Sequence, residues 1–552
     1  MNTSNRLQSG GSLLVEQLIE NKTDLAFFVP GESYLDVLNS MYDKKSTLKL
    51  INARHEAGAA NMAEAYGKLT GKPGIAFVTR GPGACHASIG VHIASQDSTP
   101  MILFIGQVST DSMEREAFQE IDYKQMFNPI AKWVTQIDKI ERIPEIISRA
   151  YRTALSGRPG PVVISLPEDI LSEKTRTRPL PSFTQEKSDI RVESIEKLRN
   201  ILSASKKPLL LLGGGSWTDK SVVSICEFAE ANNLPIATSF RRLDCVTLKN
   251  KNFVGDFGTS GPVSLIRNMH EVDALFVVGA RLGEMTTQGY KMLRPPILSK
   301  KLIHVHISEE EIGKVFTPTL GIKASPAEFS ERLRDEKLHS SLAHREWLLK
   351  LRQEYLLDKN PGPYNTDLDL GKAFSSLRDV VSEDCIYTLD AGNHSGWPQR
   401  FLDFGRPSRL VGSTCGSMGY GIPAAIAASI IFPNKLVMGF VGDGGFMMSG
   451  LELGTAIQHH AKPVIFIFNN QNYGTIRMHQ EKEYPNRVFG TDLVNPDFVN
   501  LALSFGAFAI KVKKTNEFLP AVKKAINSQK LSVIELIVDK RQLSTRMNLN
   551  DL

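Results

Sequence analysis

GFVGDGGFMMSGLELGTAIQHHAKPVIFIFNNQNYGTIR, residues 439–477, is the stretch that decides the fold. One apolar run ends in Gly-Asp-Gly-Gly at 442–445, and a second, 464–468, ends in Asn-Asn at 469–470. Short continuous apolar runs are typical of parallel strands that are buried on both faces. The roughly two dozen residues between the two loops suit one crossover helix, at about 451–459. Both loops are therefore expected at the same carboxyl edge of a sheet, where α/β proteins bind ligands.

The two loops carry groups suited to a metal ion and a phosphate. Asp443 offers a carboxylate and Asn470 an amide oxygen, which are hard ligands of the kind that Mg²⁺ and Ca²⁺ take in proteins. The neighbouring glycines let backbone N–H groups approach a phosphate beside a helix N-terminus. A Gly-Asp-Gly turn alone is common for steric reasons. The Asn-Asn pair after a second strand favours a metal-bridged diphosphate site instead.

This arrangement resembles the signature of the thiamine diphosphate enzymes, in which Gly-Asp-Gly is followed by Asn-Asn after a similar interval, and the resemblance covers nearly the whole chain. It implies that Asp443, the Asn470 side chain and the Asn472 main-chain carbonyl hold Mg²⁺ against the diphosphate of thiamine diphosphate. It also implies a cradle around that cofactor, made by Gly444, Gly445, Tyr473 and Gly474.

The composition is that of an ordinary globular protein. With 552 residues, 42% hydrophobic and 22% charged, the chain is long enough for about three domains. The net charge of +6 comes from 65 basic and 59 acidic residues without a long basic block, which gives no support for a nucleic-acid partner. Five scattered cysteines form no CxxC pair and are expected to be reduced. We recognise neither an apolar leader nor a membrane span, so we expect a cytoplasmic protein.

Strand-like apolar runs alternate with helical segments along the chain. This pattern predicts the α/β class, with doubly wound parallel sheets in three domains, at 1–175, 192–335 and 366–552. The charged, Pro- and Ser-rich segment 174–192 is interpreted as a linker, and the charged segment 331–359 as a connecting helix. By the family resemblance, the three domains are a pyrimidine-binding domain, a central Rossmann-like domain and a diphosphate-binding domain.

Glu56 carries the most specific chemistry of the first domain. A glutamate that opens a helix complements the helix dipole, so its position alone favours a structural role. The surrounding motif RHEAGAANMAEAYGKLTGKPGIAFVTRGPG, residues 54–83, resembles the pyrimidine-binding domain of the acetolactate synthase branch. The resemblance implies that Glu56 bonds N1′ of the aminopyrimidine and favours its 4′-imino form, which takes the proton from C2 of the thiazolium. The turn residues Gly31 and Pro82 are then expected to line the cofactor.

The first domain also holds candidate substrate residues. Gln107, Gln119 and Lys132 match positions that line the substrate funnel in that branch, although solvated surface polarity explains such residues equally well. Two motifs depart from the branch. The frequent Gly-Pro-Gly-Ala-Thr-Asn reads GPGACH, ending at His86, and Glu32 replaces the second glycine of a Pro-Gly-Gly turn. Because an acidic residue at this turn relays protons in related keto acid decarboxylases, Glu32 is a catalytic candidate that favours decarboxylation without carboligation.

The central domain raises the question of a flavin. A triple glycine at 213–215 follows an apolar run, 208–212, and such glycines either let a phosphate approach or simply form a tight turn. In the family this domain binds FAD in some members. The segment GARLGEM, 279–285, stands where flavin-binding acetolactate synthases show GAR followed by paired acids. FAD is therefore the less favoured interpretation.

In the third domain, further positions take their meaning from the resemblance. His394, with Asn393, matches a pair that contacts the diphosphate, whereas a lone histidine is more often a structural hydrogen-bonding group. Met418 matches the residue that keeps the cofactor bent, whereas a buried methionine otherwise fills gaps. The Gly416 carbonyl is expected to accept a hydrogen bond from the 4′-amino group.

The resemblance implies a decarboxylating carboligase of 2-keto acids, with pyruvate as the expected donor and a second 2-keto acid or an aldehyde as acceptor. Two alternatives remain: a decarboxylase that releases an aldehyde, and a catalytically silent paralogue, which the presence of Glu56, Asp443 and Asn470 disfavours. In this superfamily the cofactor is held between the first domain of one subunit and the third domain of another. A homodimer is thus the expected minimum, and a dimer of dimers is an open alternative.

Overall fold

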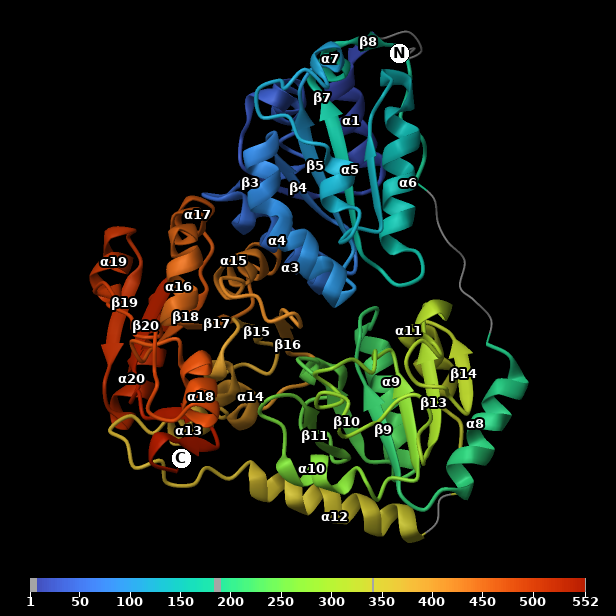
Figure 1. Ribbon diagram of the computed structural model, residues 1–552, viewed down its shortest axis with the longest axis vertical. Helices are drawn as coiled ribbons and strands as arrows, with labels where there is room; N and C mark the ends of the chain where they lie inside the picture. The colour runs from blue at the N-terminus through green and yellow to red at the C-terminus, as the bar shows by residue number, and fades with distance from the viewer. Residues whose placement is uncertain (1–6, 183–189, 340–341, 552) are drawn as a thin grey trace. The chain divides into compact units, whose positions relative to one another are not determined.

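Three six-stranded parallel sheets organise the computed structural model, which describes residues 7–182, 190–339 and 342–551 (Figure 1). With the strands numbered within each sheet, the order is 2-1-3-4-6-5 in the first and third sheets and 3-2-1-4-5-6 in the second. The latter order is that of the Rossmann fold. The predicted α/β class with three doubly wound parallel sheets is confirmed.

The described residues pack into two compact units. The first unit contains the residues before 183 together with 422–433 and 449–461, and so holds the first sheet. The second unit contains the rest, including the second and third sheets. Within the described ranges, we find no helix that is both long and apolar enough to cross a membrane.

The first sheet is formed by β2 (Leu25–Phe28), β3 (Lys49–Asn52), β4 (Gly74–Val78), β5 (Met101–Gln107), β6 (Trp133–Gln136) and β7 (Pro161–Pro167). Its helices are α1 (Gly10–Glu20), α2 (Leu35–Asp43), α3 (Glu56–Thr70), α4 (Gly81–Asp97), α5 (Tyr123–Phe127), α6 (Ile143–Leu155) and α7 (Glu168–Ser172), with the 3-10 turns η1 (Glu32–Tyr34), η2 (Thr110–Ser112) and η3 (Ile140–Arg142). Every residue of β4, β5 and β7 is buried. The apolar runs of the sequence thus form the middle of a sheet that is covered on both faces.

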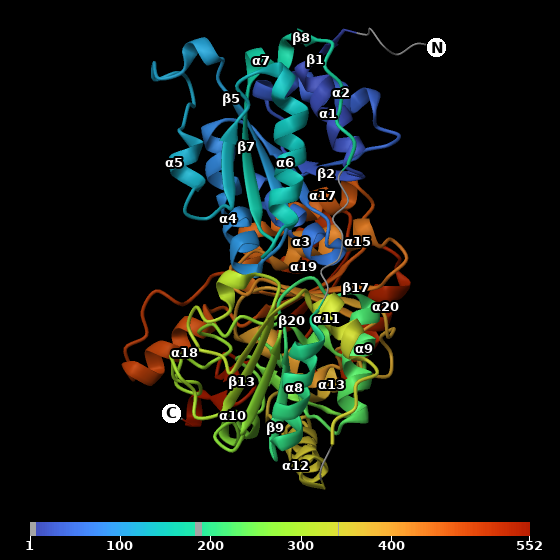
Figure 2. The same ribbon diagram turned by 90° about the vertical axis from the view of Figure 1, so that its right-hand side faces the viewer.

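Helices cover both faces of this first sheet. α6 lies over β5 and β7 (Figure 2), and its isoleucines and alanines share one apolar core with these strands. On the other face, small residues allow α3 to pack very closely on both β4 and α4: a Cβ at Gly74, the first residue of β4, would lie 1.8 Å from the Ala63 carbonyl oxygen, and a Cβ at Gly90 of α4 would lie 2.5 Å from the Ala60 Cβ. The small residues of these two helices therefore bring their N-terminal parts together.

The predicted linker, 174–192, is only partly a linker. Its first residues form β8 (Lys174–Thr175), which pairs antiparallel with β1 (Gln8–Ser9) in the first unit. The buried side chain of Gln17 then accepts from the Leu180 backbone N–H at 2.6 Å and donates to the Leu180 carbonyl at 3.0 Å. A buried amide needs such partners, and local composition does not reveal them. Residues 183–189 of the predicted linker lie outside the described residues.

The second sheet is formed by β9 (Pro208–Leu212), β10 (Ile236–Ser239), β11 (Phe253–Phe257), β12 (Ala274–Val278), β13 (Lys301–His306) and β14 (Leu320–Lys323). The helices of this part are α8 (Val192–Ala204), α9 (Asp219–Ala231), α10 (Val263–Asn268), α11 (Pro326–Leu333) and α12 (Leu342–Asp358), with the turns η4 (Leu243–Cys245) and η5 (Glu309–Glu311). The prediction of one helix at 331–359 is wrong, because α11 ends at Leu333 and α12 begins at Leu342. The two helices serve different apolar cores, with Leu333 in one and Leu348 in the other.

The third sheet is formed by β15 (Ile386–Leu389), β16 (Arg409–Gly412), β17 (Val437–Gly442), β18 (Val464–Asn469), β19 (Phe508–Val512) and β20 (Ser532–Ile537). The helices along this part of the chain are α13 (Leu370–Ser375), α14 (Gly396–Phe401), α15 (Gly421–Ile431), α18 (Gly474–Glu483), α19 (Phe498–Ser504) and α20 (Thr515–Asn527), with the turn η6 (Asn393–Ser395). All but the first residue of α15 belong to the first unit. The chain ends in the hairpin strands β21 (Gln542–Ser544) and β22 (Met547–Asn548) and the turn η8 (Leu549–Asp551). Three elements connect β17 to β18: α16 (Asp443–Ser449), η7 (Gly450–Glu452) and α17 (Leu453–Gln458). The predicted crossover helix 451–459 corresponds to the end of η7 and to α17, and α16 is an additional helix before it.

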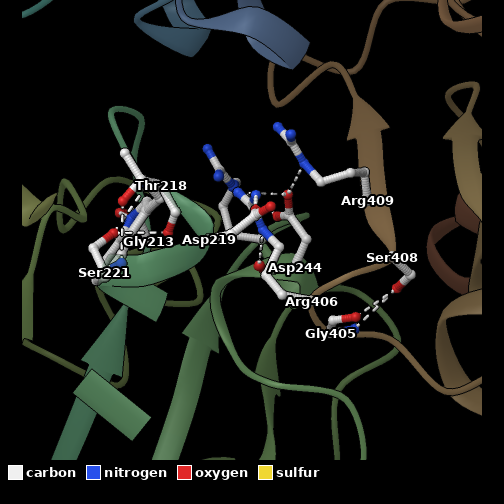
Figure 3. A network of polar contacts seen from close by, with 11 residues as sticks. Gly213, Thr218, Asp219, Ser221, Asp244, Gly405, Arg406, Ser408 and Arg409 are labelled. Atoms are coloured by element: carbon white, nitrogen blue, oxygen red, sulfur yellow. Dashed lines mark hydrogen bonds and ion pairs between the residues drawn. The ribbon is translucent and has the colours of Figure 1, made fainter. Parts of the chain in front are cut away.

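A buried ionic cluster lies between the second and third sheets (Figure 3). Asp244, in η4, is 3.3 Å from the Nε atoms of both Arg242 and Arg409, the first residue of β16. Arg406 donates to the Asp244 carbonyl at 3.1 Å and also pairs with Asp219 at the start of α9. Burial by itself would raise the pKa of Asp244, but the three arginines outweigh burial and hold this pKa below its usual value. The ionised carboxylate is therefore part of what holds the two sheets together.

Replacing Asp244 by asparagine is expected to destabilise the protein by about 3 kcal/mol at pH 7, because the arginines then lose the carboxylate they surround. A carboxyl group with a lowered pKa stabilises the fold above its unfolded pKa, and this contribution is lost as the pH falls through the folded pKa. Urea unfolding of wild type and Asp244→Asn should therefore differ at pH 7 and converge toward about pH 3. Asp219→Asn is a matched control, since the Asp219 side chain is 76% exposed, and it should cost less than about 1 kcal/mol. Equal urea midpoints for Asp244→Asn and wild type at pH 7 would contradict the assignment.

Candidate active site

The Gly-Asp-Gly loop and the Asn-Asn loop leave the third sheet side by side. β17 and β18 are parallel neighbours, with Gly442 opposite Phe468, which confirms that both loops lie at one carboxyl edge. Asp443 is 2% exposed, and its two carboxylate oxygens accept from the Gly444 N–H at 3.0 Å and from Asn495 Nδ2 at 2.8 Å. Burial raises the pKa of Asp443. A cation at this carboxylate would therefore stabilise its charged form.

Asn495 ties the Asn-Asn loop to this carboxylate, because its Nδ2 also donates to Asn469 Oδ1 at 2.9 Å. Asn470 Oδ1 accepts from the Asn472 N–H at 3.1 Å, and Asn472 Nδ2 donates to Asp492 at 3.0 Å. Asn472 Oδ1 is buried and has no hydrogen-bond partner among the described residues. A buried acceptor without a partner costs free energy, so the loop is better suited to a bound cation than to an empty site.

His394 presents a second buried polar atom near this loop. A Cβ at Gly442 would lie 3.1 Å from His394 Nδ1, so the glycine at the end of β17 makes room for the ring. Burial and the neighbouring Arg241 together lower the pKa of His394 to about 3. Its Nε2 is buried without a hydrogen-bond partner in the described part of the chain. A neutral imidazole whose Nε2 carries the proton is suited to donate to an anionic oxygen. Asn393 holds the turn in place by donating from Nδ2 to the Leu543 carbonyl at 2.8 Å.

Asp390, at the end of β15, organises the glycine-rich loop that carries Gly416 and Met418. Its two carboxylate oxygens each lie 3.0 Å from the Gly419 backbone nitrogen, which donates to them. Burial raises the pKa of Asp390 to about 6. Gly416 has a left-handed backbone with φ of +72°, and Met418 is half-buried. A Cβ at Gly445 would lie only 2.8 Å from Asp390 Oδ2, so the second glycine of the motif is needed to bring the two loops together.

The rest of the predicted cradle is also assembled by close packing. A Cβ at Gly444 would lie 2.5 Å from Tyr473 Cε1, and a Cβ at Gly474 would lie 2.9 Å from Asn470 Nδ2. The glycines therefore let the Tyr473 ring and the Asn470 amide approach the backbone, which larger residues would prevent. All the predicted residues of the Gly-Asp-Gly and Asn-Asn loops lie together.

In the first unit, Glu56 forms a compact polar group with two histidines. Glu56 begins α3, and its Oε2 lies 2.8 Å from Nδ1 of His86, which lies on α4. His55 caps the same helix by accepting from the Ala57 N–H at 3.1 Å, and its ring centroid lies 4.4 Å from that of His86. Gly83 of α4 lies beside the Glu56 side chain, since a Cβ there would be in ordinary van der Waals contact with Glu56 Cγ at 3.7 Å. His86, the residue at which the GPGACH motif departs from the family pattern, is thus a direct partner of Glu56.

Glu452 fixes the start of α3 from a distant part of the chain. Its buried carboxylate accepts from the backbone N–H groups of Arg54 at 3.2 Å and of His55 at 3.0 Å. A Cβ at Gly58 would lie 2.1 Å from Glu452 Oε1, so glycine is required for this approach. Burial raises the pKa of Glu452, while these N–H groups and the Thr455 hydroxyl partly offset the effect.

The first sheet brings most of the other predicted residues to one edge. Glu32 follows β2, Glu56 follows β3, Pro82 follows β4 and Gln107 ends β5, so these parallel strands place the four at the carboxyl edge. Lys132 is not brought to that edge. It precedes β6 at the amino edge, and its ammonium donates to two carbonyls at the end of α6. The predicted contact of Lys132 with substrate stays a prediction.

The turn residues at this edge are well held. Glu32 lies 3.5 Å from Arg80, which also binds Glu168 at 2.6 Å. A Cβ at Gly31 would lie 2.5 Å from the Thr79 Cβ, so this turn packs directly on the next loop. The remaining two candidates are fixed by backbone contacts: the buried Gln107 donates to the Ile121 carbonyl at 3.1 Å, and the carbonyl of Gln119 accepts from the Gly81 N–H at 2.9 Å.

The triple glycine of the central sheet is explained by packing. A Cβ at Gly214 would lie 1.9 Å from the Gly279 carbonyl oxygen, and a Cβ at Gly213 would lie 2.0 Å from Ser239 Oγ. Trp217 donates from its indole to the Gly213 carbonyl at 2.8 Å and closes the turn. These contacts account for the glycines without a nucleotide, so the glycines give no argument for FAD.

Asn495, Asp492, Asp390 and Glu452 are residues of these sites that sequence reasoning does not single out. Each lies outside the Gly-Asp-Gly and Asn-Asn motifs and contacts a motif residue through the fold. Glu452 lies within the stretch that decides the fold, yet its partners are in the first unit. Only for Asp390 does a sequence signal exist, because it directly follows an apolar strand at a ligand-binding edge.

Three family models match the chain in the order of its sheets. They are the thiamine pyrophosphate enzyme N-terminal TPP binding domain at 8–126, the central domain at 195–333 and the C-terminal TPP binding domain at 390–536. Thiamine pyrophosphate and thiamine diphosphate are the same cofactor.

Curated relatives match over nearly the whole chain. The acetolactate synthase large subunit of Corynebacterium glutamicum is 32% identical, over 96% of this chain and 87% of the relative. That of Lactococcus lactis is 30% identical, over 97% and 93%. The acetolactate synthase isozyme 3 large subunit of Escherichia coli is 29% identical, over 96% and 95%. Together with the loops described above, these matches confirm the resemblance seen in the sequence. The chain belongs to the thiamine pyrophosphate enzymes, in the family of the acetolactate synthase large subunits, and is a thiamine diphosphate-dependent enzyme.

Proposed function

We propose that this enzyme uses thiamine diphosphate and Mg²⁺ to decarboxylate a 2-keto acid, with pyruvate as the expected donor, and to join the remaining fragment to a second 2-keto acid or an aldehyde. The names of the relatives support this reaction. The observation that carries it is the carboxyl edge of the third sheet. There the Asp443 carboxylate and the unpartnered Asn472 Oδ1 provide negative charge and an oxygen acceptor for a cation, and the unpartnered His394 Nε2 provides a donor for a diphosphate.

The donor set fits the metal and the cofactor. Asp443, the Asn470 side chain and the main-chain carbonyl of Asn472 are hard oxygen groups that would hold Mg²⁺. His394 Nε2 and the backbone of Gly444 and its neighbours would donate to the diphosphate, as helix N-termini do. When bound, thiamine diphosphate supplies the carbon that adds to the keto group and stabilises the charge left by the loss of CO₂. No flavin is included in this proposal.

The chain's own contribution centres on Glu56. Its carboxyl group would hold the proton at N1′ of the aminopyrimidine, and a group that donates or accepts a proton in place accelerates such steps by roughly 10²–10⁴-fold. His86 orients the Glu56 carboxyl group through their 2.8 Å contact. Glu452 holds the helix start on which Glu56 stands.

The proposal includes the assembly and the location. We infer three domains at 1–175, 192–335 and 366–552, with the cofactor held between the first domain of one subunit and the third domain of its partner. A homodimer is then the minimum, and a dimer of dimers is the larger alternative. The cytoplasm is the proposed location. The mass of the enzyme in solution, measured by light scattering with and without thiamine diphosphate and Mg²⁺, tests the assembly, and a monomer under both conditions would contradict it.

A decarboxylase that releases an aldehyde is the second candidate, and Glu32 favours it. The Glu32 side chain is 68% exposed and sits at the same carboxyl edge as Glu56, with Arg80 at 3.5 Å. An exposed carboxylate at this edge is able to relay a proton from water to the product. Gln107 and Gln119 are the residues proposed to bind the substrate in either reaction, because Lys132 lies at the opposite edge of the sheet.

Product analysis separates the two reactions. Purified enzyme incubated with thiamine diphosphate, Mg²⁺ and pyruvate is expected to form acetolactate, observed by NMR. Acetaldehyde as the sole product would establish the decarboxylase, and Glu32→Gln should then lower its formation. Turnover of another 2-keto acid but not of pyruvate would change the donor and keep the reaction class. Absence of turnover with a panel of 2-keto acids, under conditions in which the cofactor is bound, would refute the catalytic proposal and favour a silent paralogue.

A further inference from the structure

A cavity of about 810 Å³ lies in the second unit, beside the C-terminal half of α12. We call it the α12 cavity, defined by Lys249, Arg352, Tyr355, Lys359, Arg378 and Asp403. Its volume is in the range of sites that hold small organic ligands, which is roughly 300–1,000 Å³.

The α12 cavity carries an excess of positive charge. Four cationic side chains line it against a single carboxylate, Asp403, among the described lining residues. Lys359 pairs with Asp403, whereas Arg352 donates to the backbone carbonyl of Phe253. Lys249 has an exposed contact of 3.5 Å with Glu383, which does not line the cavity, and its charge also acts on Asp403. These pairings leave most of the positive charge uncompensated inside the cavity.

Arg378 has hydrogen-bonding capacity to spare. Its Nε donates to the Phe401 carbonyl at 2.6 Å, which fixes the guanidinium. Its Nη2 is buried and has no hydrogen-bond partner within the described residues. A buried guanidinium N–H without an acceptor is costly, and an anionic oxygen is the acceptor it matches best.

The pKa of Lys359 reflects the excess of positive over negative charge in the α12 cavity. Burial and the neighbouring Arg378 and Arg352 together lower this pKa to about 8, because Asp403 only partly offsets their effects. The like charges around Lys359 therefore repel one another at neutral pH. An added negative charge in the cavity would relieve that repulsion.

The cavity also offers apolar surface beside its charges. The Tyr355 ring lies under the Arg352 guanidinium carbon at 5.2 Å and the Lys359 nitrogen at 5.9 Å. Leu356 and Leu349 line the cavity from α12 although they are 52% and 57% exposed. A ligand with both an anionic group and an apolar or aromatic body would contact both kinds of surface.

The α12 cavity is separate from the candidate active site in the same unit. Phe253, which also lines it, is the first residue of β11, and Arg378 and Asp403 precede β15 and β16. The cavity therefore lies at the amino ends of parallel strands. The Asp443 loop follows the carboxyl end of β17, at the opposite edge of the third sheet.

We propose that the α12 cavity binds a small organic anion that carries at least two negative charges and an apolar body. Phosphorylated and polycarboxylate compounds share this chemistry. The cationic groups neutralise the anion, and the Tyr355 and leucine surface is covered by the body of the ligand.

Isothermal titration calorimetry on the full-length enzyme at pH 7 tests this site with AMP, citrate and inorganic phosphate. AMP or citrate is expected to bind with a Kd below about 1 mM, and inorganic phosphate, which has no apolar body, more weakly. Tighter binding of AMP identifies a phosphorylated ligand, and tighter binding of citrate identifies a polycarboxylate. Failure of both AMP and citrate to bind at about 1 mM would overturn the proposal.

Charge-removing variants locate the binding. Lys249→Gln and Lys359→Gln should each weaken it about fivefold, the effect of one charge at contact distance in a hydrated site. Lys350→Gln is the matched control, because Lys350 lies on α12 but pairs with Glu271 and does not line the cavity. Lys249 is 65% exposed, so its variant is expected to fold even if Lys359→Gln does not. Binding by Lys249→Gln as tight as that of Lys350→Gln would place the anion elsewhere and refute the site.

Discussion

Replacing Glu56 by glutamine is expected to slow the exchange of the C2 proton of bound thiamine diphosphate by about 10²–10⁴-fold, and product formation with it. The amide has nearly the shape of the carboxyl group and still reaches His86, but it cannot hold and return a proton at N1′. Quenched-flow NMR of C2–H/D exchange measures the effect without substrate. Calorimetric titration of the cofactor should show nearly unchanged binding, since Glu56→Gln keeps a polar side chain at the same place.

His86→Asn separates proton transfer from orientation. His86 contacts Glu56 at 2.8 Å, so its loss is expected to slow exchange by less than about tenfold while Glu56 remains able to carry the proton. If Glu56→Gln exchanges C2–H as fast as wild type, the proton-relay assignment is wrong whatever the product analysis gives. If His86→Asn is as slow as Glu56→Gln, His86 carries the proton itself rather than orienting its neighbour.

Replacing Asp443 by asparagine is expected to weaken the combined binding of Mg²⁺ and thiamine diphosphate by at least about 100-fold. Mutating a residue that only hydrogen-bonds to a metal ligand typically lowers metal affinity by roughly 10–100-fold, and the loss of a ligand itself should have a larger effect. Wild type should gain about 2.7 kcal/mol of stability at 100 times its Kd, and the variant should lose this gain at the same concentrations. Thermal unfolding with and without both ligands measures the difference.

The metal-free protein provides a control on folding. Burial raises the pKa of Asp443 above its unfolded value, so the ionised carboxylate lowers stability once the pH exceeds the unfolded pKa. Metal-free Asp443→Asn should therefore be at least as stable as metal-free wild type at pH 7. Asp497→Asn, at the exposed cap of α19, should leave the ligand-induced gain unchanged. A full gain in Asp443→Asn would remove Asp443 from the metal site.

Asn495→Ala offers an intermediate case. Asn495 donates to Asp443 at 2.8 Å and to Asn469 at 2.9 Å, and so positions one carboxylate without binding the metal itself. Its loss should weaken cofactor binding by about 10-fold. An effect equal to that of Asp443→Asn would make Asn495 a ligand rather than a positioning residue.

The sheets could be read from the sequence because their strands are continuous apolar runs. β9 at Pro208–Leu212 has the predicted bounds, and β17 and β18 end where their loops of glycine and asparagine begin. The parallel order follows from the crossover lengths, and with it the meeting of the Asp443 and Asn470 loops at one edge. Strand patterns are local and strong, which is why these predictions hold.

The interrupted elements could not be read in this way. The helical leucine spacing across 331–359 predicts one helix. Leu333 and Leu348 belong to different apolar cores, however, and they lie on two separate helices, α11 and α12. The composition of 174–192 predicts a linker, but Lys174–Thr175 finds a strand partner at the other end of the domain. In both segments, contacts with distant parts of the chain determine the structure, and the local sequence pattern does not reveal these contacts.

By itself, the sequence determined the three α/β sheets, the family, and the residues that stand in its motifs, because apolar periodicity and motif spacing are properties of short segments. Tertiary structure alone decided which distant groups complete those motifs. Asn495 reaches Asp443, Glu452 caps the helix of Glu56, and His86 touches the Glu56 carboxyl group only after strands and helices are in register. The partner of a buried polar group is set by packing over the whole fold rather than by its neighbours in sequence.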